Sequence, residues 1–189
     1  MSAPPKSLRR ADLAMSEEQA HAALRHGYAG RLATVGPDGW PYVVPLLYVW
    51  KSGVIYVHNS SAPGHLRTNV ENNGRVCFLV DEPGTVYAYG RFECDSALSY
   101  SSVMAFGVIR IVDSDDEKAG FCDALMERYA ADVPGRPKGF YPRLDHITVY
   151  AIQVERLTGK EIKLPPASAQ WPQLDRTKSP NAKPLGTGQ

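Results

Sequence analysis

The sequence predicts a mainly β protein, a closed or split antiparallel barrel with two or three helices on its periphery. Six or seven runs rich in Val, Ile, Leu, Tyr and Phe follow one another along the chain, as strands do. Short turns containing Gly, Pro, Asp or Ser join most of them. Regular crossover helices do not separate them, which argues against a doubly wound parallel sheet.

The first expected element is a helix that begins after Ser16. Ser16 and Gln19 have the spacing of a capping box, in which each side chain bonds the backbone N–H of the other residue. The helix is expected to run to about His26, and Gly27 is a typical stop. Its buried stripe is expected to be Ala20, Ala23 and Leu24.

Three strands should follow, over residues 32–35, 42–50 and 54–58. The expected turns between them are Gly36-Pro37-Asp38-Gly39 and Lys51-Ser52-Gly53, because proline presets φ and glycine accepts a positive φ. Pro45 lies inside the second strand. Because proline cannot donate a ladder hydrogen bond, Pro45 marks a bulge, an edge or a break in pairing.

The remaining elements are two helices and up to four strands. A short helix is expected over residues 63–72, and a longer one over 113–130 with Ser114 and Glu117 as a second capping box. The stripe of the longer helix should be Cys122, Leu125, Met126 and Tyr129. Strands are expected over residues 75–81, 85–93, 100–112 and 147–156.

Composition bounds the domain organisation and the partners. The 189 residues are 43% hydrophobic and 22% charged, with a net charge of +1, which is typical of one globular domain without a nucleic-acid partner. No apolar run approaches the roughly 18 residues that span a bilayer, so no membrane partner is expected. Three cysteines without CxxC spacing and no apolar leader predict reduced thiols in a cytoplasmic protein.

Three segments are expected: a flexible N-terminal arm (1–14), a barrel domain (15–164) and a Pro-rich C-terminal tail (165–189). The tail either lacks order or is held on a partner subunit. Its isolated Trp171 either anchors it across a dimer or is itself unordered.

Several separated blocks carry a resemblance to a known family. They are GRLATV, DGWPYVVPLLYVW, VIYVH, Gly64-His65, RVCFLVD and SVMAFGVIRIVDSDDEK. Over roughly residues 15–156 the chain resembles the pyridoxamine 5'-phosphate oxidase-related, FMN-binding split-barrel superfamily, and within it the Nim-like proteins of 5-nitroimidazole resistance. The resemblance implies a six-stranded antiparallel split β-barrel and a homodimer. FMN would lie in a groove at the dimer interface, so that each site uses both chains.

The resemblance also assigns parts of this site. It places the FMN phosphate near the third strand and the following helix, and the flavin ring along the second strand. His58 has the position of a histidine that lies near the cofactor in the Nim-like branch, which makes it the candidate catalytic residue. That branch usually has lysine where this chain has Leu66. Arg67, His65 and Arg31 are the candidate substitutes.

Elementary chemistry supports a phosphate site at this helix. The first turn of a helix presents unpaired N–H groups and the positive end of the dipole, and an arginine there adds a bidentate donor. The candidate cofactor contacts are Arg31, Val44, Pro45, Leu46, Leu47, Tyr48, His58, Asn59, Ser60, Ser61, His65, Leu66, Arg67, Thr68, Asn69, Tyr87, Tyr89 and Arg91. Residues 43–47 would act through their backbone, and the patch of Tyr87, Tyr89 and Arg91 would form a wall of the site, from the second chain.

Plainer interpretations stay open for each group. Ser60 and Ser61 would only cap the helix, with Arg67 solvated. His58 would bond a backbone carbonyl, and His65 would be a surface histidine. The second strand would be ordinary core, and the Tyr87 patch would be dimer packing, where Tyr and Arg are enriched.

Three functions remain. The leading hypothesis is an FMN-binding oxidoreductase that reduces a small substrate, a nitro-aromatic being the guess that the resemblance suggests. The alternative is a non-enzymatic carrier or sensor that binds flavin or haem, with FAD and haem less expected than FMN and His58 as the axial ligand of a haem. A third is a dimeric barrel without a cofactor, because Leu66 removes the lysine. No metal site is expected, since His58, His65, Cys77 and His146 lack ligand spacing.

Overall fold

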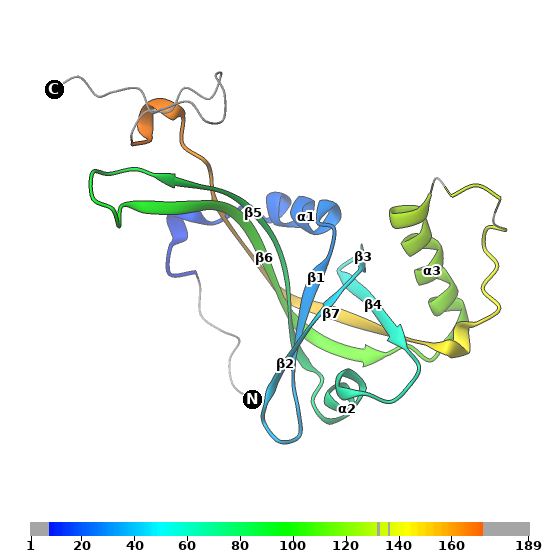
Figure 1. Ribbon diagram of the computed structural model, residues 1–189. Coiled ribbons are helices and arrows are strands. Elements are labelled where there is room, and N and C mark those ends of the chain that lie inside the picture. The colour runs from blue at the N-terminus through cyan, green and yellow to red at the C-terminus, as the bar shows by residue number, and fades with distance from the viewer. Residues whose placement is uncertain (1–7, 132, 136, 172–189) are drawn as a thin grey trace.

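The computed structural model describes residues 8–131, 133–135 and 137–171, and in them a seven-stranded antiparallel sheet curls into an open barrel (Figure 1). The strands are β1 (Gly30–Val35), β2 (Pro41–Leu46), β3 (Tyr48–Lys51), β4 (Val54–Ser60), β5 (Arg75–Ala88), β6 (Ser96–Ile111) and β7 (Ile147–Ile162). The helices are α1 (Glu17–His26), α2 (His65–Asn72) and α3 (Asp115–Ala130), with 3-10 turns at Ala11–Leu13, Leu144–His146 and Ala167–Ala169. The strand order is β2-β1-β5-β6-β7-β4-β3, so the predicted split-barrel class is confirmed.

The N-terminal helix forms as predicted. The hydroxyl of Ser16 accepts the N–H of Gln19, and the side chain of Gln19 accepts the N–H of Ser16. Ala20 and Leu24 are buried, and Ala23 packs against the same core. The next predicted turns also form. Gly39 has a φ of +82°, while Ser52 and Gly53 have φ values of +49° and +83°.

The predicted second strand, over residues 42–50, is in fact two strands, β2 and β3. The sheet therefore has seven strands rather than the six that the resemblance implies. β2 pairs with β1, whereas β3 pairs with β4 at the opposite edge of the sheet. The chain changes from one edge to the other at Leu47. Pro45 lies in the edge strand β2, opposite Arg31, where its missing N–H costs little.

Two further boundaries differ from the predicted ones. β5 continues past Pro83 to Ala88, with a shift in register between Pro83 and Val86. The hydroxyl of Ser99 spans this irregularity, because it accepts the N–H of Thr85 at 2.8 Å and donates to the Thr85 carbonyl at 3.1 Å. The predicted strand over 85–93 therefore stops at residue 88, and β7 extends to Ile162, beyond the predicted end.

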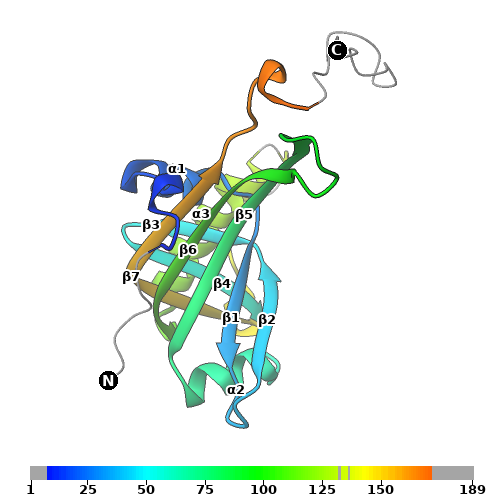
Figure 2. The same ribbon diagram turned by 90° about the vertical axis from the view of Figure 1, so that its left-hand side faces the viewer.

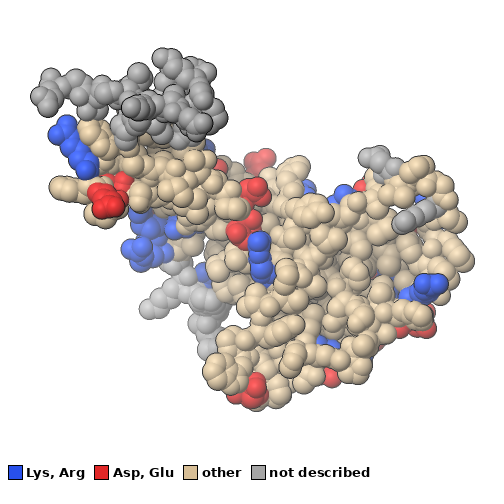
Figure 3. Space-filling view, in the orientation of Figure 1, with Lys and Arg blue, Asp and Glu red and all other residues tan. Residues whose placement is uncertain are grey.

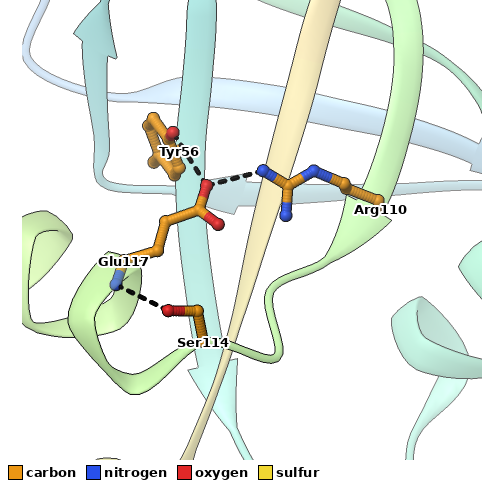
Figure 4. Close-up of polar contacts among 4 residues, drawn as sticks. All are labelled: Tyr56, Arg110, Ser114 and Glu117. Atoms are coloured by element: carbon orange, nitrogen blue, oxygen red, sulfur yellow. Dashed lines mark hydrogen bonds and ion pairs between the residues drawn. The ribbon is translucent and has the colours of Figure 1, made fainter.

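α3 is anchored to the sheet by its first turn. The hydroxyl of Ser114 accepts the N–H of Glu117, but the Glu117 carboxylate does not complete the predicted capping box. It accepts instead from Arg110 Nη2 at 2.6 Å and from the Tyr56 hydroxyl at 2.9 Å (Figure 4). The charged Arg110 on β6 and the neutral hydroxyl of Tyr56 on β4 thus take the place of the cap, and they tie the start of α3 to two strands.

Two apolar clusters hold the fold together. The first fills the barrel, where Phe78, Tyr48 and Tyr150 are fully buried. The second lies between α3 and the outer side of β3, β4 and β7, and contains Phe121, Cys122 and Leu125. Phe121 was missed by the predicted stripe, and Met126, which belonged to it, is 39% exposed.

The segments on either side of the barrel pack on their own chain as far as they are described. Ala14 forms a β-bridge with Lys160. Trp171 donates its N–H to the Ala88 carbonyl at 2.9 Å, and the Arg91 guanidinium lies 5.1 Å from the centre of its ring. The rest of the predicted arm and tail, residues 1–7 and 172–189, lies outside the described residues. Cys77, Cys94 and Cys122 are unpaired thiols. None of the described helices is long and apolar enough to cross a bilayer.

Candidate functional site

The candidate site begins where β4 ends and α2 starts, at one end of the barrel (Figure 2). Ser61 fixes the connection by donating its N–H to the His146 carbonyl at 3.0 Å. Gly64 is the N-cap of α2 in an extended conformation, and no side chain bonds the first turn. The interpretation that Ser60 and Ser61 only cap this helix is therefore wrong. The first N–H groups of α2 remain available to an anion.

The side chains of α2 divide between the barrel and the surface. Leu66 and Asn69 are each 4% exposed and close the end of the barrel. The Asn69 amide donates to the Thr34 hydroxyl at 2.9 Å. This amide was a candidate donor to the phosphate, and the bond to Thr34 already uses it. Leu66 stands where the resembling family has lysine, and its side chain lies in the core. Neither side chain is therefore free to meet a ligand, and the Asn69 carbonyl is also engaged, because it accepts the N–H of Asn73 at 2.7 Å.

The outward face of α2 carries a cation and a histidine. Arg67 donates Nε to Glu71 at 2.9 Å, and this partner raises the pKa of the guanidinium. His65 is exposed, with its ring centre 5.6 Å from that of Tyr42 on β2. Thr68 is exposed beside them. Arg67 and His65 thus bring positive charge and ring N–H groups to the head of the helix.

His58 lies on the outer side of β4, under α3. Its ring centre is 5.4 Å from that of Phe121, and its Nδ1 atom is buried without a hydrogen-bond partner among the described residues. The interpretation that the imidazole bonds a backbone carbonyl therefore does not hold for Nδ1. Burial lowers the pKa of the imidazole, because it disfavours the charged form. His58 is consequently neutral at pH 7.

Asn59 points the other way, toward Tyr150 on β7. The Asn59 Oδ1 atom and the Tyr150 hydroxyl are both buried, and neither makes a hydrogen bond of adequate geometry within the described part of the chain. Burial raises the pKa of Tyr150, while the nearby Asn59 and Arg67 act in the opposite direction. Buried polar atoms without partners are rare and each costs about 1–3 kcal/mol. Their concentration around the end of β4 indicates an incomplete polar site.

The residues expected along the flavin ring lie on β2 and just after it. Pro45 is exposed, Val44 and Leu46 pack toward the barrel, and Leu47 packs against the second cluster. Tyr48 is fully buried and donates its hydroxyl to the Leu24 carbonyl at 2.6 Å, so that its side chain is closed to a ligand.

Arg31 lies on the outer face of the sheet and forms an ion pair with Asp81 at 2.6 Å. Arg31 and Arg67 are thus both ion-paired, and of the two only Arg67 lies on α2.

Tyr87, Tyr89 and Arg91 lie far from α2 in the same chain. They occupy the outer end of the β5–β6 hairpin, and α2 lies at the opposite end of the barrel in both views (Figures 1 and 2). Tyr89 is 57% exposed, with its ring centre 6.4 Å from that of Tyr87. One chain thus brings the α2 residues together and leaves this patch apart.

Three cavities lie elsewhere on the described surface. They measure about 470 Å³ between α3 and residues 137–141, about 660 Å³ between the N-terminal segment and β7, and about 280 Å³ between the β3–β4 hairpin and α3. None of the three is lined by a candidate cofactor residue. Within the described residues, no group of three His, Cys, Asp or Glu side chains is placed to hold a metal ion.

Sequence reasoning missed two residues that shape the site. Tyr150 was placed in an ordinary strand, and only the hydroxyl on an otherwise apolar inward position could have signalled it. Phe121 covers His58 from α3. No sequence signal pointed to that contact, because it joins segments more than sixty residues apart.

Three solved structures share this fold. The flavocytochrome Anf3 from Azotobacter vinelandii has a TM-score of 0.72 and 20% identity, over 94% of this chain and 91% of that chain. The FAD and heme binding protein from Mycobacterium smegmatis has a TM-score of 0.67 and 23% identity, over 79% and 72%. A protein from Bacteroides thetaiotaomicron, assigned provisionally to 5-nitroimidazole antibiotic resistance, has a TM-score of 0.65 and 20% identity, over 78% and 85%.

No curated protein matches this chain. The family model described as pyridoxamine 5'-phosphate oxidase matches residues 16–161. That span contains all three α-helices, every strand apart from the last residue of β7, and every candidate cofactor residue. This confirms the resemblance drawn from the sequence blocks, and the chain belongs to the pyridoxamine 5'-phosphate oxidase family.

Proposed function

We propose that this chain is an FMN-binding flavoprotein that works as a homodimeric oxidoreductase on a small substrate, a nitro-aromatic compound being the leading candidate. The observation that carries the proposal is the open head of α2, where Gly64 leaves the first turn without a side-chain cap. Family membership and the flavin named in the descriptions of two solved relatives support the same cofactor class.

The residues present fit an FMN phosphate at this place. A Cβ built on Gly64 meets nothing within 4 Å, so an oxyanion has room to approach the backbone. The N–H groups of the first turn, the exposed Ser60 and the guanidinium of Arg67 are donors that suit a dianion. The buried Tyr150 hydroxyl and Asn59 Oδ1 atom, both without hydrogen-bond partners among the described residues, lie behind this cation.

The bound flavin would supply the redox chemistry by accepting and donating electrons or a hydride. The chain's own residues would hold it and shape its surroundings. Arg67 and the head of α2 would fix the phosphate, and the backbone of β2 would offer hydrogen bonds along its free edge. His58, neutral at pH 7, would offer a ring nitrogen as a hydrogen-bond acceptor. Phe121 would exclude water from one side of the His58 imidazole.

A largely apolar sheet face, which also carries the Arg31–Asp81 ion pair, supports the homodimer. On the side of the sheet that points away from the barrel core, Phe106 lies opposite Cys77 and Met104 lies opposite Leu79. Val43 extends this face onto β2, and it is 59% exposed, while Met104 is 41% exposed. We call this the outer face. Contiguous exposed apolar surface marks an interaction site, and a two-fold dimer covers the same patch on both copies.

The test is a titration of the purified protein with FMN, followed by quenching of flavin fluorescence. The wild type is expected to bind FMN, and Arg67→Ala is expected to weaken binding about tenfold or more, because a charged hydrogen bond to the phosphate is lost. Arg25→Ala on α1 removes the same charge far from α2 and is the matched control. Equal affinities for the wild type and Arg67→Ala would remove Arg67 from the phosphate site.

The cofactor class and the reaction are tested on the same preparation. Flavin bands in the absorbance spectrum are expected, and a Soret band would favour the haem-binding alternative instead. Bleaching of the bound flavin by NAD(P)H under anaerobic conditions, followed by return of its colour on adding a nitro-aromatic, is the expected result. Flavin that binds but is never reduced by NAD(P)H or a partner reductase would contradict the oxidoreductase.

A further inference from the structure

A cavity of about 470 Å³ opens between α3 and the segment that follows it in the chain. Beyond Ala130, where α3 ends, residues 137–143 run back beside the helix toward the 3-10 turn at Leu144–His146 (Figure 1). Residues 137–141 of this returning segment form one wall of the cavity, and the last two turns of α3 form the other. The volume lies in the range of roughly 300–1,000 Å³ that is typical of small-molecule sites.

The two walls are fastened together at one end of the cavity. The Tyr141 hydroxyl donates to Asp123 Oδ1 at 2.7 Å, and the Tyr141 side chain packs against the apolar cluster beneath α3. Gly139 has a φ of +68°, a conformation that glycine adopts without strain, and a Cβ built on it meets nothing within 4 Å. The walls therefore meet at Asp123, and the space beyond that contact stays open.

Large apolar side chains line this cavity without filling it. Met126 on α3 is 39% exposed, and Phe140 and Val133 on the segment after it are 66% and 41% exposed. Ala130 and Pro137 add smaller apolar surfaces. Figure 3 shows few Lys, Arg, Asp or Glu side chains over the part of that view formed by α3 and the segment after it. A ligand with an apolar body is therefore favoured, because it removes this surface from water.

Two carboxylates stand among these apolar side chains. Asp123 and Glu127 both line the cavity and lie one helical turn apart on α3. Among the described residues, no ion pair includes either of them. Arg128, the basic residue in the last turn of α3, is engaged elsewhere, with the Gly27 carbonyl and the Tyr48 ring. The charge of Asp123 and Glu127 is thus available to a ligand.

The electrostatics of the cavity favour a cation. The carbonyl groups at the C-terminal end of a helix carry partial negative charge, and the cavity lies along that end of α3. Lys138 also lines the cavity, so that two carboxylates stand against one ammonium group. Within the described residues, no three His, Cys, Asp or Glu side chains are placed to hold a metal ion. An organic cation matches both the charge and the apolar walls, whereas a bare ion would leave those walls in water.

We propose that this cavity binds an arylalkylamine, an aromatic ring joined to an ammonium group by a short alkyl chain. The ammonium group lies between Asp123 and Glu127, which are close enough on the helix for both to accept from its three N–H donors. The ring lies against Met126 and Phe140. The helix rises about 10 Å from Asp123 to Ala130, at roughly 1.5 Å per residue, which suits a ligand of this length. No candidate cofactor residue lines the cavity, so the proposal is independent of the flavin.

Three probes of similar shape test the charge preference. Phenethylamine, phenethyl alcohol and hydrocinnamate carry a phenyl ring on a short chain that ends in an ammonium, a hydroxyl or a carboxylate group. In titrations followed by amide NMR spectra, phenethylamine is expected to shift signals of residues 123–141 and to bind about tenfold tighter than the alcohol, because only the amine makes charge-assisted hydrogen bonds. Hydrocinnamate is expected not to bind. Equal binding of amine and alcohol, shifts confined to other residues, or no binding of the amine would overturn the proposal.

Substitutions in the cavity test the place of binding. Glu127→Gln and Asp123→Asn are each expected to weaken phenethylamine binding about three- to tenfold and to leave the alcohol unchanged, and the new Asn keeps an oxygen that accepts from Tyr141. Glu18→Gln removes the same charge from an exposed position of α1 and is the matched control. Ala130→Phe places a ring inside the cavity and should abolish binding of both probes. Unchanged amine affinity in the two carboxylate variants, or in Ala130→Phe, would overturn the proposal.

Discussion

Leu66 shows how the barrel, rather than a ligand, determines a residue at the head of α2. It is 4% exposed and belongs to the cluster that fills the barrel, together with Val70 one turn later. The cation of this helix therefore comes from the neighbouring position, where Arg67 faces outward. In the sequence, Leu66 departs from the lysine that the resembling branch usually has at this position. The packing of Leu66 in the barrel core explains why an apolar side chain is suited to position 66.

Leu66→Lys is expected to destabilise the fold by about 3 kcal/mol, because it removes apolar burial and brings an ammonium group toward the core. The measurement is the free energy of unfolding from urea denaturation. Thr68→Lys adds the same charge at an exposed position of the same helix and should change stability by less than about 0.5 kcal/mol. Equal stabilities of the two variants would show that position 66 readily turns to the surface.

Glu117 connects single-residue chemistry to the placement of α3. Arg110 and Tyr56 both donate to its carboxylate, and the Arg110 bond is the main reason that the pKa of Glu117 lies below its usual 4.5. A carboxyl whose folded pKa is lowered stabilises the protein fully above its unfolded pKa. That stabilisation is lost as the pH falls through the lower, folded value.

Glu117→Gln is therefore expected to lower the free energy of unfolding by about 1 kcal/mol at pH 7, after allowing for the partial exposure of the pair. As the pH falls below 4.5 and through the lower pKa of the folded state, the difference from the wild type should shrink, because the wild-type carboxyl becomes protonated. Urea denaturation between pH 3 and pH 7 measures both effects. Glu127→Gln, on the same helix and without a described partner, should show neither. A difference that does not depend on pH would contradict the ionic origin.

At the scale of whole elements, capping and turn residues in the sequence located most helix and strand boundaries. Pairing between strands that are distant in the sequence determined the remaining boundaries. The capping box of α1 and the Ser52-Gly53 turn depend on a few adjacent residues, so the sequence was sufficient for both. The break at Leu47 was not predicted, because residues 42–50 read locally as one strand. It exists because β1 and β4 lie at opposite sides of the sheet and each takes one half of that run.

The long strand β6 offers a test of close approach between strands. A Cβ on Gly107 would lie 2.1 Å from the Gln153 carbonyl oxygen, at the register shift between β6 and β7. Gly107→Ala is expected to cost more than about 2 kcal/mol of unfolding free energy, since backbone must move. Gly120→Ala in α3 meets nothing within 4 Å and should gain about 0.5–1 kcal/mol from helix propensity. Thermal melts of the two variants should move in opposite directions.

At the scale of the whole molecule, the candidate site was only partly predictable. The segment from His58 to Arg67 does form one end of the barrel, because strand, turn and short helix follow one another in sequence. The opposite directions of His58 and Asn59 follow from strand alternation, but which of them faces α3 depends on packing between distant segments. The cofactor contacts themselves stay predictions, since the partner chain and the flavin that would complete them leave no local pattern.

The outer face gives the sharpest test of assembly. Met104→Lys places a charge at the centre of a patch that the proposed dimer buries, and an unpaired buried charge is costly. We expect the variant to keep the secondary structure of the wild type, to run as a monomer in light scattering, and to lose FMN affinity because each site needs both chains. Met126→Lys is the matched control, because Met126 is similarly exposed, at 39% against 41%, but lies on α3. A Met104→Lys protein that remains a dimer would place the interface elsewhere, and a monomer that binds FMN as tightly as the wild type would show that one barrel suffices.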